Sequence, residues 1–177
     1  MGEEKTLMKM EATVTIKGAI FAGKGPEIIQ SEVLAFMYEA TAFLERKVKE
    51  NIREAGRVGV GGAQGGLLST IHGEVEKGTP VTKGVVAHQS KYGDVIEKGR
   101  TPGKTWPPEG ALLKWMMLKM GLGETEAKRL EFVVRRKIGR KGFPGIHMFE
   151  KAWTRYLPQI IAMADTHGLK LAERLSE

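Results

Sequence analysis

The chain contains no cysteine, few aromatic residues and no long apolar run. The absence of cysteine excludes disulfides, thiolate nucleophiles, iron–sulfur clusters and cysteine-based zinc sites. No apolar run approaches the roughly 20 residues that a membrane-spanning helix needs. The first ten residues also lack the apolar middle of a signal peptide. We therefore expect no membrane partner.

The remaining composition is typical of a globular protein. The chain has 177 residues, of which 41% are hydrophobic and 28% are charged, and this is enough material for one hydrophobic core. We predict a single domain over residues 1–177. Six glycines between Gly56 and Gly66 predict a mobile loop at 56–66. Residues 158–177 are expected to form a peripheral C-terminal helical segment.

The positive charge is concentrated in one part of the chain. Residues 98–141 contain 12 basic and 4 acidic side chains, a net charge of +8. Residues 1–97 contain 12 basic and 13 acidic side chains, and residues 142–177 contain 4 of each. A localised basic segment favours a polyanion or an acidic protein surface as partner, and it does not indicate the fold.

Apolar periodicity predicts the secondary structure. Residues 12–21 are rich in β-branched side chains and predict a strand. From Glu27 to Ala55, apolar residues recur at steps of three and four, which predicts a long helix with one apolar stripe. A β-hairpin is predicted from 67–75 and 81–90, with 92–99 continuing its second strand or forming a turn. The later predicted elements are helices at 109–120 and 124–138, a turn at 139–145, and a helix at 146–175 with kinks or breaks at Pro158 and Gly168.

This order of elements predicts an α+β fold. A small antiparallel sheet would pack against one long N-terminal helix and several C-terminal helices. The order differs from the alternating βαβ pattern of a doubly wound sheet.

Motifs for catalysis or cofactor binding are incomplete. Gly18–Lys24 matches the start of a phosphate-binding loop, but Gly25 stands where a magnesium-binding hydroxyl is needed. In 59–64, Gln64 occupies the third glycine position of a dinucleotide fingerprint. The four histidines are scattered without metal-ligand spacing. We therefore expect no enzyme activity, no catalytic, cofactor-binding or metal residues, no cofactor and no small-molecule substrate.

The basic segment has two interpretations. Its cations could contact nucleic-acid phosphates, or they could form the solvated face of an amphipathic helix. Few aromatic residues lie among them to stack on bases. A basic nucleic-acid-binding domain using the 128–141 cluster is therefore kept as the alternative function. Its cations are Lys128, Arg129, Arg135, Arg136, Lys137, Arg140 and Lys141.

A series of blocks between Val85 and Ala152 resembles a known family. The first block contains Tyr92, Glu97, Gly99 and Arg100 in the order Tyr-x-x-x-x-Glu-x-Gly-Arg. A Trp-bearing segment around Leu112–Trp115 follows, then Phe132–Ile138, then a Gly-Phe-Pro-Gly turn and Met148–Ala152. This order resembles the minor tail, or head–tail joining and tail-completion, family of long-tailed bacteriophages, over roughly residues 28–152.

The resemblance implies a virion structural protein without catalysis. Proteins of that family assemble as rings, commonly hexameric, in the neck or at the top of the tail, where they complete the tail and join it to the head. The implied partners are other copies of the chain, other phage neck and tail proteins, and DNA that passes through the ring lumen without specific recognition. The implied location is the virion neck or tail, after synthesis in the bacterial host cytoplasm.

Because phage DNA channels are usually acidic inside, the family interpretation assigns the basic segment first to an assembly surface and second to a DNA contact. The candidate interface residues are Tyr92, Glu97, Arg100, Trp106, Trp115, Arg135, Arg136, Lys137, Arg140 and Lys141.

Overall fold

A computed structural model describes residues 10–14, 25–56, 66–78, 81–103 and 106–176. The predicted 56–66 loop and the 18–24 and 59–64 motifs fall almost entirely outside these residues. In chain order the elements are β1 (Met10–Val14), α1 (Gly25–Glu54), a 3₁₀ helix (Leu67–Thr70), β2 (Ile71–Glu76), β3 (Thr82–His88), α2 (Gly93–Lys98), β4 (Gly99–Arg100), α3 (Leu113–Met120), α4 (Glu124–Lys141), β5 (Phe143–Pro144) and α5 (Met148–Ser176).

The chain divides into two compact units, which we describe separately. The sheet unit comprises the described residues within 8–50, 71–87 and 149–177. The α3–α4 unit comprises those within 51–70 and 88–148. The single domain expected over residues 1–177 stays a prediction.

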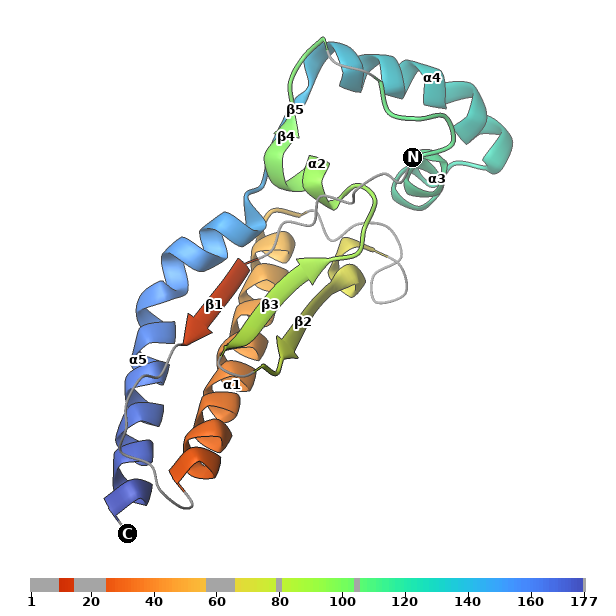
Figure 1. The fold of residues 1–177 in the computed structure, drawn as a ribbon. Helices are drawn as coiled ribbons and strands as arrows, with labels where there is room; N and C mark the ends of the chain where they lie inside the picture. The colour runs from red at the N-terminus through yellow and green to blue at the C-terminus, as the bar shows by residue number, and fades with distance from the viewer. Residues whose placement is uncertain (1–9, 15–24, 57–65, 79–80, 104–105, 177) are drawn as a thin grey trace, which may run out of the picture. The chain divides into compact units, whose positions relative to one another are not determined.

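The sheet unit contains a three-stranded sheet in the order β1–β3–β2 (Figure 1). Strand β1 pairs antiparallel with β3, with Met10 opposite Val86 and Val14 opposite Thr82. Strand β3 is therefore central and β2 lies at an edge. The predicted hairpin is confirmed, and the predicted 12–21 strand begins earlier, at Met10, while residues 15–21 lie outside the described part.

Residues 67–70 form a 3₁₀ turn, so the prediction of a strand from Leu67 was wrong for this segment. The Ser69 hydroxyl donates to the Gly66 carbonyl at 2.8 Å, and the Thr70 hydroxyl donates to the Leu67 carbonyl at 2.7 Å. Such local side-chain hydrogen bonds compete with strand pairing. A run of apolar and β-branched residues does not reveal them.

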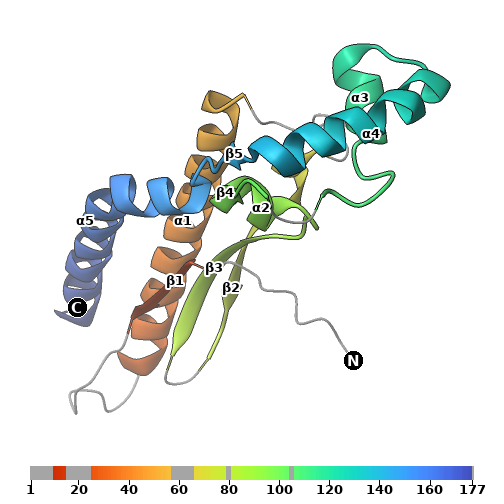
Figure 2. The same cartoon turned by 90° about the horizontal axis from the view of Figure 1, so that it is seen from above.

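Helix α1 forms the centre of the sheet unit and packs against both α5 and the sheet (Figure 1, Figure 2). Its predicted apolar stripe is confirmed by buried side chains at steps of three and four, from Phe36 through Leu44 to Val48. The rings of Phe43 and Tyr156 of α5 meet edge to face, with centroids 5.8 Å apart. Helix α5 continues through Pro158 and Gly168, so neither residue ends it.

The α3–α4 unit contains a short helix where a turn or a strand extension was predicted. Residues Gly93–Lys98 form α2. Gly93 allows α2 to lie close to His88 at the end of β3, because a Cβ at Gly93 would lie 2.3 Å from the His88 ring. Gly99 then adopts φ +78°, a backbone conformation that glycine allows.

Two boundaries in this unit differ from the prediction. Helix α3 begins at Leu113, after turns at 109–112, and α4 continues to Lys141. The turn predicted at 139–145 is therefore reduced to Gly142 and the short strand β5, which pairs antiparallel with β4. Gly142 has φ +61°, and its N–H donates to the Ile138 carbonyl. The α+β class predicted from the sequence is confirmed.

Candidate functional site

Helices α3 and α4 form a helical hairpin, joined by the short link 121–123. Met116 of α3 and Ala127 of α4 are fully buried. Gly121 ends α3 in the left-handed conformation, with φ +66°. The packing of α3 on α4 fixes which of their faces point to solvent.

The loop before α3 is fastened to α4 by two charged side chains. Glu131 is 4% exposed, and its two carboxylate oxygens accept hydrogen bonds from the Gly110 N–H at 3.1 Å and the Leu112 N–H at 3.2 Å. The Arg135 Nε donates to the Pro107 carbonyl at 2.7 Å. A charged group strengthens each hydrogen bond, so these contacts stabilise the hairpin internally.

Trp106 lies against the C-terminal half of α4. Its ring meets Phe132 edge to face, with centroids 5.5 Å apart. A Cβ at Gly139 would lie 2.3 Å from Trp106 Cδ1, so only glycine leaves room for the indole. Trp106 is nevertheless 40% exposed. It therefore combines an internal contact with a solvent-facing edge.

The exposed large apolar side chains concentrate in this hairpin and the loop before it. Thirteen such side chains are exposed in the described part of the chain, and eight of them lie between residues 106 and 133. Clustered exposed apolar surface marks interaction sites more often than single exposed residues do. The eight are Trp106, Trp115, Met117, Leu118, Met120, Leu130, Phe132 and Val133.

The candidate residues before the hairpin differ in exposure. Tyr92 is exposed and Arg100 is half-buried. Glu97 is 1% exposed, and its carboxylate accepts a hydrogen bond from the Met148 N–H, the first residue of α5. The Glu97 backbone carbonyl accepts another from the His147 N–H at 3.1 Å. The Glu97 side chain therefore acts inside the α3–α4 unit, at the positive end of a helix.

The basic cluster of α4 separates into internal and solvent-facing cations. Arg135 is half-buried and bonded to Pro107. Lys128 forms an ion pair with Glu124, at 2.6 Å from Nζ to Oε1. The remaining five cations are solvent-exposed, and none of them forms an ion pair within the described residues: Arg129, Arg136, Lys137, Arg140 and Lys141.

A second charged cluster lies in the sheet unit, between α1 and α5. The buried His167 ring has Glu32 Oε2 at 3.1 Å from Nδ1 and Glu39 Oε2 at 3.0 Å from Nε2. Arg174 also pairs with Glu32. Spacing along the sequence gave no signal of this cluster, because the histidine follows its two carboxylates by 135 and 128 residues.

The geometry of this cluster favours a charged imidazole. A neutral ring donates from one nitrogen only, whereas both nitrogens of His167 face carboxylate oxygens, which accept and cannot donate when ionised. The hydrogen bond to Glu39, assisted by the one to Glu32, raises the pKa of His167. The hydrogen bond from His167, followed by that from Arg174, lowers the pKa of Glu32. The cluster is therefore an ionic clamp between two helices.

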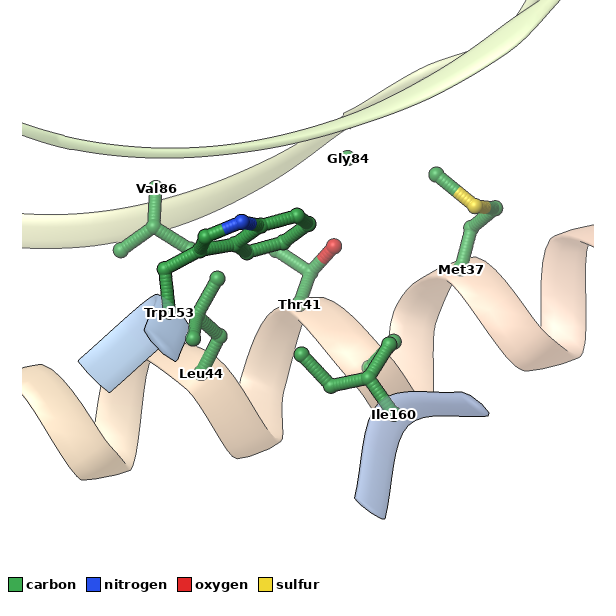
Figure 3. Close-up of a pocket in the computed structure, with 8 residues that line it drawn as sticks. Met37, Thr41, Leu44, Gly84, Val86, Trp153 and Ile160 are labelled. Carbon is green, nitrogen blue, oxygen red and sulfur yellow. The ribbon is translucent and has the colours of Figure 1, made fainter. Parts of the chain in front are cut away.

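The space between α1, α5 and β3 is core and offers no ligand site. Figure 3 shows the side chains from these three elements that surround it, among them Thr41, Trp153 and Ile160. The space left among them is about 10 Å³. That is the size of a single water probe, so the region is a packed interior.

Among the described residues, no group of three or more acidic or histidine side chains is placed to hold a metal ion. Within the same residues, no helix is long and apolar enough to cross a membrane. No family model, curated protein or solved structure matches the chain.

Proposed function

We propose that this chain is a structural protein of the neck or tail top of a long-tailed phage, where it assembles as a ring that completes the tail and joins it to the head. The observation that carries the proposal is the concentration of exposed apolar side chains on the α3–α4 hairpin. A folded monomer leaves this surface in water, at a cost that association removes. The order of sequence blocks and the α+β fold support it.

A closed ring needs a heterologous interface, in which one patch meets a different patch on the next copy. The α3–α4 hairpin supplies one patch. The strand β2 is a candidate for the other, because it lies at an edge of the sheet, where a further strand can add beyond the Gly73 N–H, which donates to Glu45 Oε2 at 2.8 Å. Two of the three exposed side chains of β2, Glu74 and Glu76, are acidic, opposite in sign to the hairpin.

The proposed ring, a hexamer by the family resemblance, contacts other neck and tail proteins and encloses DNA without reading its sequence. It uses no cofactor and catalyses no reaction. The protein is made in the bacterial host cytoplasm and ends in the virion. The interface candidates on the hairpin are Trp106 and Trp115, together with the solvent-facing cations of α4.

Sedimentation of the purified chain and imaging of the particle neck test the proposal. The variant Trp115→Ser/Leu118→Ser should fold and lose association, whereas Leu169→Ser, at a still more exposed apolar site of α5, should keep it. If the purified chain is monomeric, the wild type and the two variants are each mixed with extracts that contain neck or tail proteins. Averaged particle images then show whether rings form. A particle reconstruction that places single copies away from the tail axis would overturn the proposal.

A basic nucleic-acid-binding function is the second candidate, favoured by the five solvent-facing cations of α4. This function predicts DNA binding that depends little on base sequence and whose affinity falls steeply as the salt concentration rises. Arg136→Glu/Lys137→Glu/Arg140→Glu should abolish that binding. Arg135 is left unchanged because it holds Pro107. Absence of binding at about 50 mM salt eliminates this function.

A further inference from the structure

Four residues of α4 lie along one line of the helix. Arg129, Val133, Arg136 and Arg140 are separated by four, three and four residues, a spacing that keeps side chains on one face. Ala127, Glu131 and Val134 occupy the opposite face, and they are buried or half-buried. We call the four outward residues the arginine seam. Phe132 lies beside it and is 54% exposed.

The side chains of the arginine seam face solvent in the described part of the protein. Its three arginines are exposed, and none pairs with an acidic side chain among the described residues. The neighbouring cations differ, since Lys128 pairs with Glu124 and Arg135 holds the loop before α3. Val133 between the arginines is 59% exposed. The seam therefore presents three charged side chains and one apolar side chain to solvent, all open to a partner.

We propose that the arginine seam binds an acidic amphipathic segment of a partner protein, with carboxylates on the arginines and apolar side chains on Val133 and Phe132. Planar guanidinium groups match carboxylates in a fork geometry. Arginine and aromatic residues are enriched in protein interfaces. A DNA backbone would satisfy the arginines but would leave Val133 and Phe132 without an apolar partner.

The length of the seam sets the size of the partner segment. From Arg129 to Arg140 the helix rises roughly 16 Å, which is about three turns. A three-turn helix with Glu or Asp at the same alternating four-and-three spacing would place a carboxylate near each arginine and leucines over Val133. The inference names a partner for part of the surface on which the ring proposal rests, but it concerns the isolated chain and does not require a ring.

Peptide binding to the purified full chain tests the inference. The probe is a labelled helical peptide of roughly 15 residues, with glutamate and leucine in that spacing. A second peptide carries glutamine in place of glutamate, and a duplex of about 20 base pairs represents DNA. Binding is followed by fluorescence anisotropy at about 50 and 150 mM salt. The seam variant is Arg129→Gln/Arg136→Gln/Arg140→Gln, and its matched control, Lys128→Gln/Lys137→Gln/Lys141→Gln, removes the same charge beside the seam.

The inference predicts that the glutamate peptide binds, and that the glutamine peptide and the seam variant each lose about tenfold or more in affinity. The lysine control should stay within about threefold. Phe132→Ala/Val133→Ala should weaken binding of the peptide and leave any DNA binding unchanged. Backbone amide shifts of the wild-type chain, which need no variant, should localise the peptide to 129–140.

Three results would overturn the inference: no peptide binding, equal loss in the seam variant and the lysine control, or binding of DNA without binding of the peptide. In each case sedimentation of the same protein still reports on ring assembly, so the two failures are distinguishable.

Discussion

The close approach of α1 to the sheet can be tested by filling the space that one glycine leaves open. A Cβ added at Gly84 of β3 would lie 2.2 Å from Thr41 Oγ1 and 3.2 Å from Met37 Cε. Gly73 of β2 makes a similar close approach, because a Cβ added there would lie 2.7 Å from Thr41 Cγ2. The separation of helix and sheet is therefore set by Thr41 standing over two glycines.

The expected cost of Gly84→Ala follows from this geometry. Overpacking a well-filled core costs about 1–3 kcal/mol, and the gain from a less flexible unfolded chain offsets about 0.4–1 kcal/mol. The cavity of about 10 Å³ beside Thr41 cannot absorb a methyl group. Thr41→Ala removes the clashing Oγ1 and leaves Thr41 Cβ 3.6 Å away, an ordinary contact, while the flexible Met37 side chain, with Cε at 3.2 Å, can shift by a few tenths of an ångström. The double variant should therefore be more stable than Gly84→Ala alone, with a coupling of about 1–3 kcal/mol.

Urea unfolding followed by circular dichroism measures all four members of this cycle, with unchanged slopes as the condition for comparison. The control is Gly168→Ala, because a Cβ at this exposed helical position meets nothing within 4 Å. That substitution should stabilise the chain by up to about 1 kcal/mol. If the costs of Gly84→Ala and Thr41→Ala are simply additive, the reasoning about close approach is refuted.

Two further predictions concern buried charges. Because the pKa of His167 is raised in the folded protein, the clamp's contribution is fully present below the ordinary histidine pKa of about 6.5 and is lost as pH rises through the folded value. The stability difference between wild type and His167→Gln should therefore shrink above about pH 6.5, and a constant difference in thermal melts from pH 5 to 9 would contradict the clamp. Glu131→Ala should destabilise the α3–α4 unit by about 2–4 kcal/mol because two N–H groups lose their acceptor. Hydrogen exchange of the 110–120 amides should accelerate in that variant but not in Glu126→Ala, which changes an exposed carboxylate on the same helix.

Long periodic elements were predictable, and short ones were not. Helix α1 presents one apolar stripe over about six turns, a signal that no local contact outweighs. By contrast, α2 has six residues and depends on Gly93 lying against the His88 ring, a contact that no periodicity encodes. The 3₁₀ turn at 67–70 likewise depends on two hydroxyl contacts to backbone carbonyls.

The sequence contains a signal for one of two buried charged side chains, Glu131, but none for the other, His167. Glu131 lies in line with Ala127, Val134 and Ile138 on the packed face of α4, and a carboxylate within an apolar stripe indicates a buried acceptor. His167 depends on the pairing of α1 with α5, elements far apart in the chain. A clamp formed by such a pairing cannot be read from residue spacing.

The same distinction changes how the basic segment is understood. The net charge of 98–141 includes cations that already have partners within the protein. Arg135 donates a hydrogen bond to the Pro107 carbonyl, and Lys128 forms an ion pair with Glu124. The cations that stay open on α4 lie on both sides of exposed Phe132 and Val133 along the helix. A surface evolved only to attract phosphates gains nothing from exposed apolar side chains, which lower solubility. Their presence beside the arginines favours a protein partner that has both carboxylates and an apolar stripe. Substitutions in the seam therefore test whether the partner is a protein or a nucleic acid, and not only whether it is negatively charged.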